Sequence, residues 1–118
     1  MEPNIVLGNL IIAPDSARVW VGALRVDLTY SEFELLLKLA RRPGRIMGRD
    51  EMVRGLGEDT PNGHRGRLNV HIHRLRRKLE LSSPWQIETV RRRGYVLRMT
   101  GSESDGALEG LSESREVS

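Results

Sequence analysis

The densest run of ionisable side chains in this sequence lies between residues 67 and 78. The run contains no Asp or Glu, and its ionisable members are Arg67, His71, His73, Arg74, Arg76, Arg77 and Lys78. Like charges at this density repel one another, which costs stability unless a polyanion neutralises them. Guanidinium groups bind phosphate oxygens and can bind the O6 and N7 acceptors of guanine. The run therefore predicts a surface that binds nucleic acid.

The same run has the periodicity of an amphipathic helix over residues 67–81. One side of that helix, which should face the core, collects Leu68, Ile72, Leu75 and Leu79. The opposite side collects Arg67, Val70, Arg74 and Arg77, with His71, His73 and Lys78 on its flanks and Arg76 nearer the core edge. The major groove of B-DNA admits a single helix, and Val70 suits the methyl group of thymine. We expect this helix to bind double-stranded DNA.

A second cationic group, Arg91-Arg92-Arg93-Gly94, separates two stretches that have the pattern of β-strands, residues 85–90 and 95–99. Three adjacent cations in so short a turn cannot all pair within the protein. A hairpin can project them into a DNA minor groove, whose negative potential attracts arginine. Gly94 can adopt the positive φ that a tight turn requires. We expect Tyr95 to pack beneath the hairpin.

The rest of the chain supplies the elements that hold these two groups in place. Short apolar stretches over residues 5–28 predict a small antiparallel sheet. Thr29 and Glu32 have the spacing of a capping box, which predicts a helix over residues 30–41. A second helix is predicted over residues 49–56, with a weak cap at Gly48. Residues 57–66 are rich in Gly, Pro and Asn and predict a loop.

The distribution of charge divides the chain in two. Residues 101–118 contain five acids and one arginine and have a net charge of −4. Because the whole chain has a net charge of +3, residues 1–100 have a net charge of +7. We expect one folded domain over residues 1–100 and a disordered acidic tail over residues 101–118. No apolar run is long enough for a membrane span, and the start lacks the basic region of a signal peptide. A cytoplasmic protein is expected.

Metal and catalytic sites find little support in the residues. The chain has no cysteine, which excludes disulfides, thiolate metal sites and cysteine nucleophiles. A rival metal site would use His64, His71 and His73 with Asp59 or Glu58. His71 and His73 point about 200° apart on a helix, so they cannot chelate one ion together. The hydroxyl groups lie in caps or the tail without a paired base. We expect no cofactor, no metal and no enzymatic activity.

Four segments, in order, resemble the DNA-binding effector domain of OmpR/PhoB-type response regulators, the output proteins of two-component systems. These segments are residues 28–36 (LTYSEFELL), 49–53 (RDEMV), 70–79 (VHIHRLRRKL) and 89–95 (TVRRRGY). The resemblance covers residues 5–99. It implies an α+β fold, a winged helix-turn-helix with an N-terminal antiparallel sheet, three helices and a C-terminal β-hairpin wing.

The resemblance also implies roles for residues and partners. By position, the residues of the recognition helix that face DNA or contact phosphate are Val70, His71, His73, Arg74 and Arg76. On the wing, the residues that contact the DNA backbone and the minor groove are Thr89 and Arg91. Loop 57–66 stands where the family contacts RNA polymerase. Such domains usually bind direct repeats as tandem homodimers.

Three features depart from the family pattern. Gly66-Arg67-Leu68-Asn69 stands where the family usually has Arg-Thr-Val-Asp. The first arginine of that pattern, which normally contacts a phosphate, is absent, and Arg65 and Arg67 are the candidates to replace it. Arg92 replaces a common wing glycine. The phosphoacceptor receiver domain that usually precedes this domain is missing, which predicts either an excised fragment or a stand-alone effector.

A rival function is a winged helix that binds protein, such as RNA polymerase or another regulator, in place of DNA. A protein-only adaptor has no need of a helix with a cationic outer face. The charge pattern therefore favours DNA over a protein-only partner, and the family resemblance implies that the binding is sequence-specific, to double-stranded DNA, by a bacterial transcription regulator.

Overall fold

The computed structural model describes residues 2–54, 61–82 and 84–99, and for residues 61–67 it describes the backbone without the side chains. The predicted acidic tail, residues 101–118, lies outside the described residues, as does residue 100, the predicted end of the domain. Within the described part of the chain, no helix is both long and apolar enough to cross a lipid bilayer.

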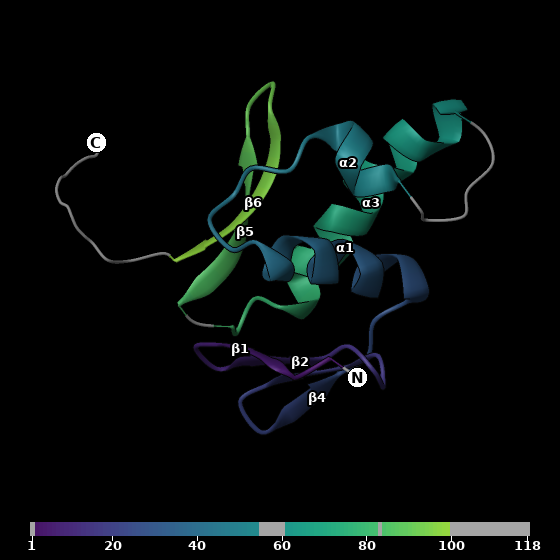
Figure 1. Ribbon diagram of the computed structural model, residues 1–118. Coiled ribbons are helices and arrows are strands. Elements are labelled where there is room, and N and C mark those ends of the chain that lie inside the picture. Colours follow the sequence, from purple (N-terminus) through teal and green to yellow (C-terminus); the bar gives the residue numbers. More distant parts are fainter. Residues whose placement is uncertain (1, 55–60, 83, 100–118) are drawn as a thin grey trace, which may run out of the picture.

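A four-stranded antiparallel sheet forms the N-terminal layer (Figure 1). Its strands are β1 (Ile5–Leu7), β2 (Leu10–Ala13), β3 (Arg18–Val21) and β4 (Leu24–Val26), in the order β1-β2-β3-β4. Leu10 and Ile12 are fully buried, and Val19, the register partner of Ile12, is 1% exposed. Alternate residues of β2 and β3 therefore face the core. The sheet predicted over residues 5–28 is confirmed.

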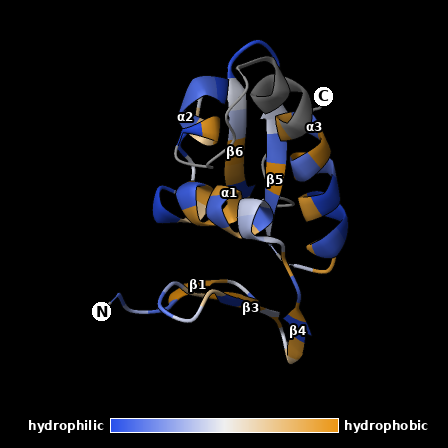
Figure 2. Ribbon diagram, turned by 90° about the vertical axis from the view of Figure 1, so that its right-hand side faces the viewer, coloured by the Kyte–Doolittle hydropathy of each residue, from blue (hydrophilic) through white to orange (hydrophobic). Residues whose placement is uncertain are grey.

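Helix α1 (Tyr30–Arg41) begins at the predicted capping box. The Thr29 hydroxyl accepts a hydrogen bond from the Glu32 N–H at 3.2 Å, and the Glu32 carboxylate accepts one from the Thr29 N–H at 3.0 Å. Leu35, Leu36 and Leu39 are fully buried. The helix lies between the sheet and the other helices, where it packs on both (Figure 2).

Helix α2 (Arg49–Val53) is a short element that side chains hold at both ends. At its start, the Glu51 carboxylate accepts a hydrogen bond from the Gly48 N–H at 3.0 Å. At its end, the Lys38 ammonium donates to the carbonyl groups of Glu51, Met52 and Arg54. The sequence predicted residues 49–56; Arg54 is not helical, and residues 55 and 56 lie outside the described residues.

Helix α3 (Pro61–Lys78) differs at both ends from the predicted span of 67–81. The predicted loop is wrong at residues 61–66, which are helical, and its residues 57–60 lie outside the described residues. A proline fits this start because the first N–H groups of a helix have no intrahelical acceptor. At the other end, the Leu79 N–H is shared between the carbonyl groups of Leu75 and Arg76, and the Ser82 N–H bonds to Leu79. The chain there tightens into turns before Pro84.

The C-terminal strands β5 (Trp85–Val90) and β6 (Gly94–Met99) form the predicted antiparallel hairpin, or wing. Met47, before α2, pairs with Tyr95 through hydrogen bonds of 2.7 and 3.0 Å. The core-facing stripe of α3 is also confirmed, since Leu68, Ile72, Leu75 and Leu79 are at most 4% exposed. The wing and α3 therefore stand on one packed core, with the wing tip at the end of the molecule far from the sheet (Figure 1).

Candidate nucleic-acid interface

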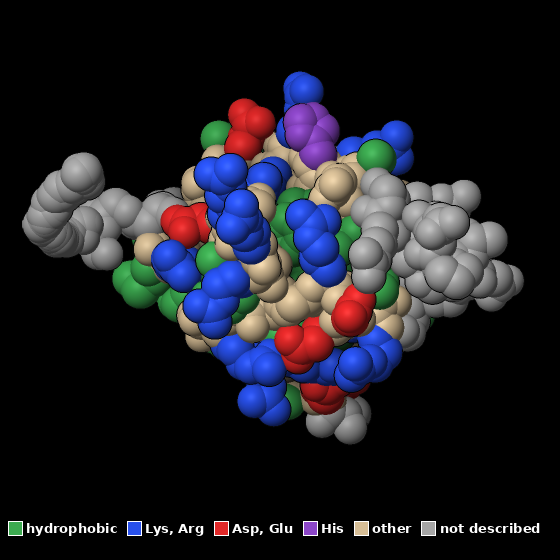
Figure 3. Space-filling model, turned by 90° about the horizontal axis from the view of Figure 1, so that it is seen from above, with side chains coloured by type: hydrophobic (Ala, Val, Ile, Leu, Met, Phe, Trp, Pro, Cys, Tyr) green, Lys and Arg blue, Asp and Glu red, His purple; other side chains and the backbone are tan. Residues whose placement is uncertain are grey.

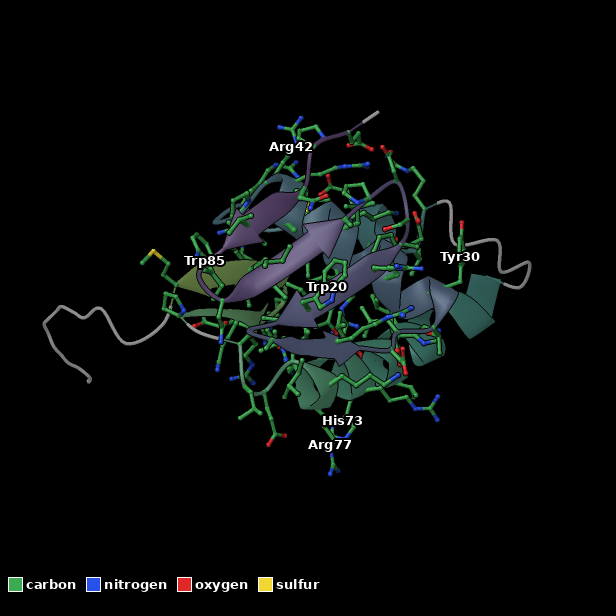
Figure 4. All side chains as sticks on the ribbon, turned by 90° about the horizontal axis from the view of Figure 1, so that it is seen from below. Trp20, Tyr30, Arg42, His73, Arg77 and Trp85 are labelled. Atoms are coloured by element: carbon green, nitrogen blue, oxygen red, sulfur yellow. The ribbon has the colours of Figure 1, made fainter. Side chains whose placement is uncertain are left out.

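The outer face of α3 carries the side chains that the helical pattern placed there. Val70 is 46% exposed, and His73, Arg74 and Arg77 are exposed. His73 and Arg77 project together away from the body of the protein (Figure 4). The side chain of Arg67 lies outside the described residues. A valine that reaches solvent beside three cationic or ionisable groups is the arrangement that the DNA-binding hypothesis requires.

Most arginines of the two cationic groups are free of the protein's own acids. Among the described residues, none of the ion pairs includes Arg74, Arg77 or the three wing arginines. Viewed from above, Lys and Arg side chains gather over the wing tip and its surroundings, with a few acids between them (Figure 3). The protein thus presents cations that an external anion can neutralise.

Two cations of α3 are instead engaged inside the protein, and the first is Arg76. Its Nε donates to the Ile87 carbonyl at 3.1 Å, and its Nη2 donates to the Thr89 hydroxyl. Its guanidinium also lies 5.9 Å from the centroid of the Tyr95 ring. Arg76 therefore joins α3 to the wing and fixes the hydroxyl of Thr89, a connection that helical spacing alone could not predict.

Lys78 is the second engaged cation. Its ammonium lies 2.6 Å from a carboxylate oxygen of Glu32, which is fully buried at the start of α1. Burial by itself raises the pKa of the Glu32 carboxyl, but the hydrogen bond from Lys78, the bond from the Thr29 N–H and the nearby positive charges outweigh it. The pKa of Glu32 therefore lies below its ordinary value. This ion pair attaches the end of α3 to α1. His71, two turns earlier on α3, is half-buried.

The wing turn owes its shape to two residues with positive φ. Arg92 has φ +66°, the left-handed conformation that favours glycine. Gly94 has φ +139°, and a Cβ at Gly94 would lie 1.9 Å from the Met47 carbonyl oxygen. From the sequence, Gly94 was expected to supply the positive φ of the tight turn. The structure adds that Arg92 occupies the left-handed position and that Gly94 is also needed for the close approach of the Met47 backbone.

The junction between α2, α3 and the wing contains two polar residues that the sequence did not single out. The Tyr95 hydroxyl donates to Asn69 Oδ1 at 2.7 Å, and Arg49 Nη1 donates to the same oxygen at 3.2 Å. The Arg49 guanidinium lies 5.8 Å from the centroid of the Tyr95 ring. Tyr95 is 3% exposed, as its predicted packing requires. Because the partners come from three elements, no local spacing could have found this junction.

The alternative metal site cannot be assembled from the described residues. In residues 2–54, 61–82 and 84–99, no group of three or more His, Asp and Glu side chains could hold a metal ion. Glu58, Asp59 and the side chain of His64 lie outside that description.

Comparison with known proteins gives a consistent result. The family model described as "Transcriptional regulatory protein, C terminal" matches residues 23–97. The alkaline phosphatase synthesis transcriptional regulatory protein PhoP of Bacillus subtilis is 38% identical over 99 residues, which are 82% of this chain and 41% of PhoP. The transcriptional regulatory protein RstA of Escherichia coli is 36% identical over 91 residues, which are 75% of this chain and 38% of RstA. The chain thus spans less than half the length of these curated relatives.

Two solved structures share the fold and align over nearly their whole length. The RstA DNA-binding domain of Klebsiella pneumoniae, in complex with the RstA box, has a TM-score of 0.70 and 35% identity and covers 82% of this chain and 98% of its own. The DNA-binding domain of CpxR from E. coli has a TM-score of 0.70 and 28% identity and covers 85% of this chain and all of its own. The chain therefore belongs to the OmpR/PhoB-type winged-helix family, the C-terminal DNA-binding domains of transcriptional regulatory proteins, and not to a family of enzymes.

Proposed function

We propose that this chain binds double-stranded DNA sequence-specifically as the DNA-binding part of a bacterial transcription regulator. Helix α3 lies in the major groove and the wing in the adjacent minor groove. The observation that carries the proposal is the set of exposed arginines on α3 and the wing tip, which no carboxylate among the described residues neutralises. The related RstA domain, at 35% identity, was solved in complex with the RstA box.

On α3, the exposed side chains contact the edges of the bases. Arg74 can bind guanine O6 and N7 with both guanidinium branches, and Val70 can contact a thymine methyl. Arg77, on the same face, and His73, on its flank, contact phosphates or neighbouring bases. His71, half-buried, contributes from the flank. Arg67, by its place in the sequence, adds a cation on the N-terminal side of Val70 on the same helix.

On the wing, Arg91, Arg92 and Arg93 enter the minor groove, where negative potential attracts arginine without strong dependence on sequence. Thr89 and Arg76 act together, because the hydroxyl and the guanidinium are hydrogen-bonded. Their exposed edges can reach a phosphate, while their mutual contact keeps the wing at a fixed distance from α3. Positioning of the wing is thus the main contribution of Arg76.

Two further partners complete the proposal. Residues 57–66 contact RNA polymerase, and two copies of the chain bind direct repeats of the site as a tandem homodimer. The contact with RNA polymerase is inferred from the place of residues 57–66 in the family pattern, and the tandem homodimer from the way in which such domains usually bind. Both depend on DNA binding itself.

Selection of bound duplexes from a random library tests the proposal. We expect one short motif to be enriched, with a repeat at fixed spacing if two copies bind in tandem. Retention of all sequences to the same degree would contradict sequence-specific binding, and retention of none would contradict DNA binding altogether.

A further inference from the structure

The base of the wing contains a partly open cavity to which the proposed function assigns no ligand. The cavity lies where α3 ends and β5 begins (Figure 1), and its volume is about 130 Å³. Its lining consists of Arg76, Leu79, Glu80, Ser82, Trp85, Gln86, Ile87 and Leu97. A cavity of about 150 Å³ holds a molecule of benzene, whereas the pockets of drug-sized ligands measure about 300 Å³ or more. The size of this cavity therefore suits a ligand with one small apolar group.

The inner wall of the cavity is apolar. Leu79, Ile87 and Leu97 are at most 8% exposed and belong to the hydrophobic core. Trp85 is half-buried and packs against the same core. Because an apolar wall offers water no hydrogen bonds, an apolar group that displaces this water is stabilised by leaving the solvent. The inner part of the cavity thus favours a hydrocarbon side chain.

Two side chains of opposite charge, Arg76 and Glu80, lie on the same lining. Among the described residues, none of the ion pairs includes either of them. Arg76 donates to the Ile87 carbonyl and to the Thr89 hydroxyl, which are both neutral. A guanidinium has five N–H groups, so Arg76 keeps donors beyond these two bonds. The cavity therefore presents one cation and one anion that an external molecule can neutralise.

The two neutral polar side chains of the lining are used within the protein. The Ser82 hydroxyl donates to the Trp85 carbonyl at 2.8 Å, and Gln86 Nε2 donates to the Ser82 carbonyl at 3.4 Å. The charged pair then decides which ligand is preferred. A simple anion is attracted by Arg76 and repelled by Glu80, and a simple cation has the reverse problem. A zwitterion satisfies both charges.

We propose that this cavity binds a free α-amino acid with an aliphatic side chain of the size of valine or leucine. The carboxylate accepts hydrogen bonds from Arg76, the ammonium donates to Glu80, and the side chain contacts the apolar wall. Because a carboxylate is a stronger acceptor than the Thr89 hydroxyl, the ligand draws the Arg76 guanidinium away from Thr89 and loosens the wing from α3. The amino acid is thus an effector that lowers DNA affinity. This effect rests on the proposed DNA binding, whereas the binding of the amino acid does not.

A fluorescence titration with L-leucine tests the site without DNA. The chain has two tryptophans, so Trp20→Phe leaves Trp85, on the lining, as the only emitter. We expect its emission to change and to saturate at millimolar leucine or below. Calorimetry of the unmodified chain repeats the measurement without the substitution. Three probes each lack one part of leucine: 4-methylpentanoate the ammonium, 3-methylbutylamine the carboxylate, and glycine the side chain. Each should bind at least about fivefold more weakly.

Glu80→Gln tests the assigned partner of the ammonium and leaves the proposed DNA contacts in place. Since Glu80 is exposed, the fold should be retained. We expect leucine to bind at least about fivefold more weakly, because a charge-assisted hydrogen bond is lost. Asp27→Asn is the matched control, since Asp27 is also exposed and does not line the cavity. It should bind leucine as the unmodified chain does.

The same variants are then compared on a duplex of mixed sequence. Saturating leucine should lower the DNA affinity of the unmodified chain and of Asp27→Asn several-fold, and Glu80→Gln should need more leucine for the same effect.

The outcomes separate the two proposals. Absence of saturable binding of both leucine and valine contradicts the site, and so does equal binding of leucine and glycine or an unchanged affinity in Glu80→Gln. Binding of leucine that leaves DNA affinity unchanged overturns the effector role. A chain that binds leucine but no duplex contradicts the proposed DNA binding alone.

Discussion

Arg92 holds the left-handed position of the wing turn at φ +66°, where a side chain bearing Cβ is strained. Left-handed backbone costs about 1–2 kcal/mol for a residue other than glycine. A sequence under selection for stability alone would place glycine here. The arginine is consistent with a benefit outside the folding of the isolated protein, namely binding of an anion at the tip.

Arg92→Gly therefore separates stability from binding. The free energy of unfolding should rise by about 1 kcal/mol because the strain is relieved, while the salt dependence of DNA affinity should weaken. Thermal or denaturant unfolding and a salt titration measure the two effects. Arg91→Gln removes a neighbouring charge and should weaken the salt dependence without the gain in stability. Stability that does not rise in Arg92→Gly would argue against strain at this position.

Arg74→Ala addresses base reading. Loss of a bidentate contact should cost about 1–3 kcal/mol of binding free energy and relax the preference at one position of the selected site. Competition between the selected duplex and its single-base variants measures this change, with Arg18→Ala as the control for lost charge. An equal loss on every sequence would make Arg74 a phosphate ligand.

At the scale of residues, the sequence predicted which side of α3 faces the core and which side faces solvent, because both follow from a fixed angle per residue. It could not predict where Arg76 and Lys78 point. Lys78 meets Glu32, 46 residues earlier in the chain, and Arg76 meets the hairpin. Such partners depend on tertiary packing, which leaves no local pattern.

Among the elements, α1 and α3 are joined by the ion pair between Glu32 and Lys78. Because the pKa of Glu32 is lowered in the folded protein, the pair contributes stability above the ordinary pKa of a glutamate. That contribution is lost as the pH falls through the lowered value. His71 adds a favourable charge interaction with the same carboxylate. The recognition helix is thus attached at its C-terminal end by a pH-sensitive contact.

Lys78→Met tests this attachment. At neutral pH the variant should lose roughly 1–2 kcal/mol of unfolding free energy, less than a fully buried pair would because the Lys78 side chain is 36% exposed. Urea unfolding of both proteins from pH 7 downwards measures the difference. The difference in unfolding free energy between the two proteins should narrow as the pH falls below the usual range of glutamate pKa values, since protonated Glu32 has no charge to pair with Lys78. A difference that stays constant with pH would contradict the ion pair.

The ends of elements were the part of the fold least accessible from sequence. The capping box at Thr29 and Glu32 set the start of α1 correctly because two reciprocal hydrogen bonds leave a specific spacing. The start of α3 had only Pro, Asn and Gly, which are common in loops, and yet Pro61 begins the helix. Pro61 fits that start because the first N–H groups of a helix have no intrahelical acceptor, but the same residue is equally common in loops.

In the whole molecule, the N-terminal sheet lies at one end and the wing tip at the other, and α3 packs against α1 between them (Figure 1). The separation of charge also extends to the sequence beyond the described residues, where residues 101–118 carry −4. An acidic segment attached to a +7 remainder can compete with DNA for the same cations. We propose such competition as the role of this tail.

Deletion of residues 101–118 tests the role of the tail. Affinity for a duplex of mixed sequence should rise several-fold at low salt, and the gain should shrink as salt screens the tail. A version that keeps the length but replaces the five acids with Ser controls for excluded volume and should behave like the deletion. If neither the deletion nor the Ser variant binds the duplex more tightly than the unmodified chain, the tail does not compete with DNA.

The central claim is that uncompensated arginines on α3 and the wing neutralise DNA phosphates, and the salt dependence of binding by the unmodified chain tests it most directly. For four or more phosphates neutralised, affinity for a duplex should fall by at least about 10²-fold between about 50 and about 200 mM salt. An affinity that is the same at both salt concentrations would contradict the account.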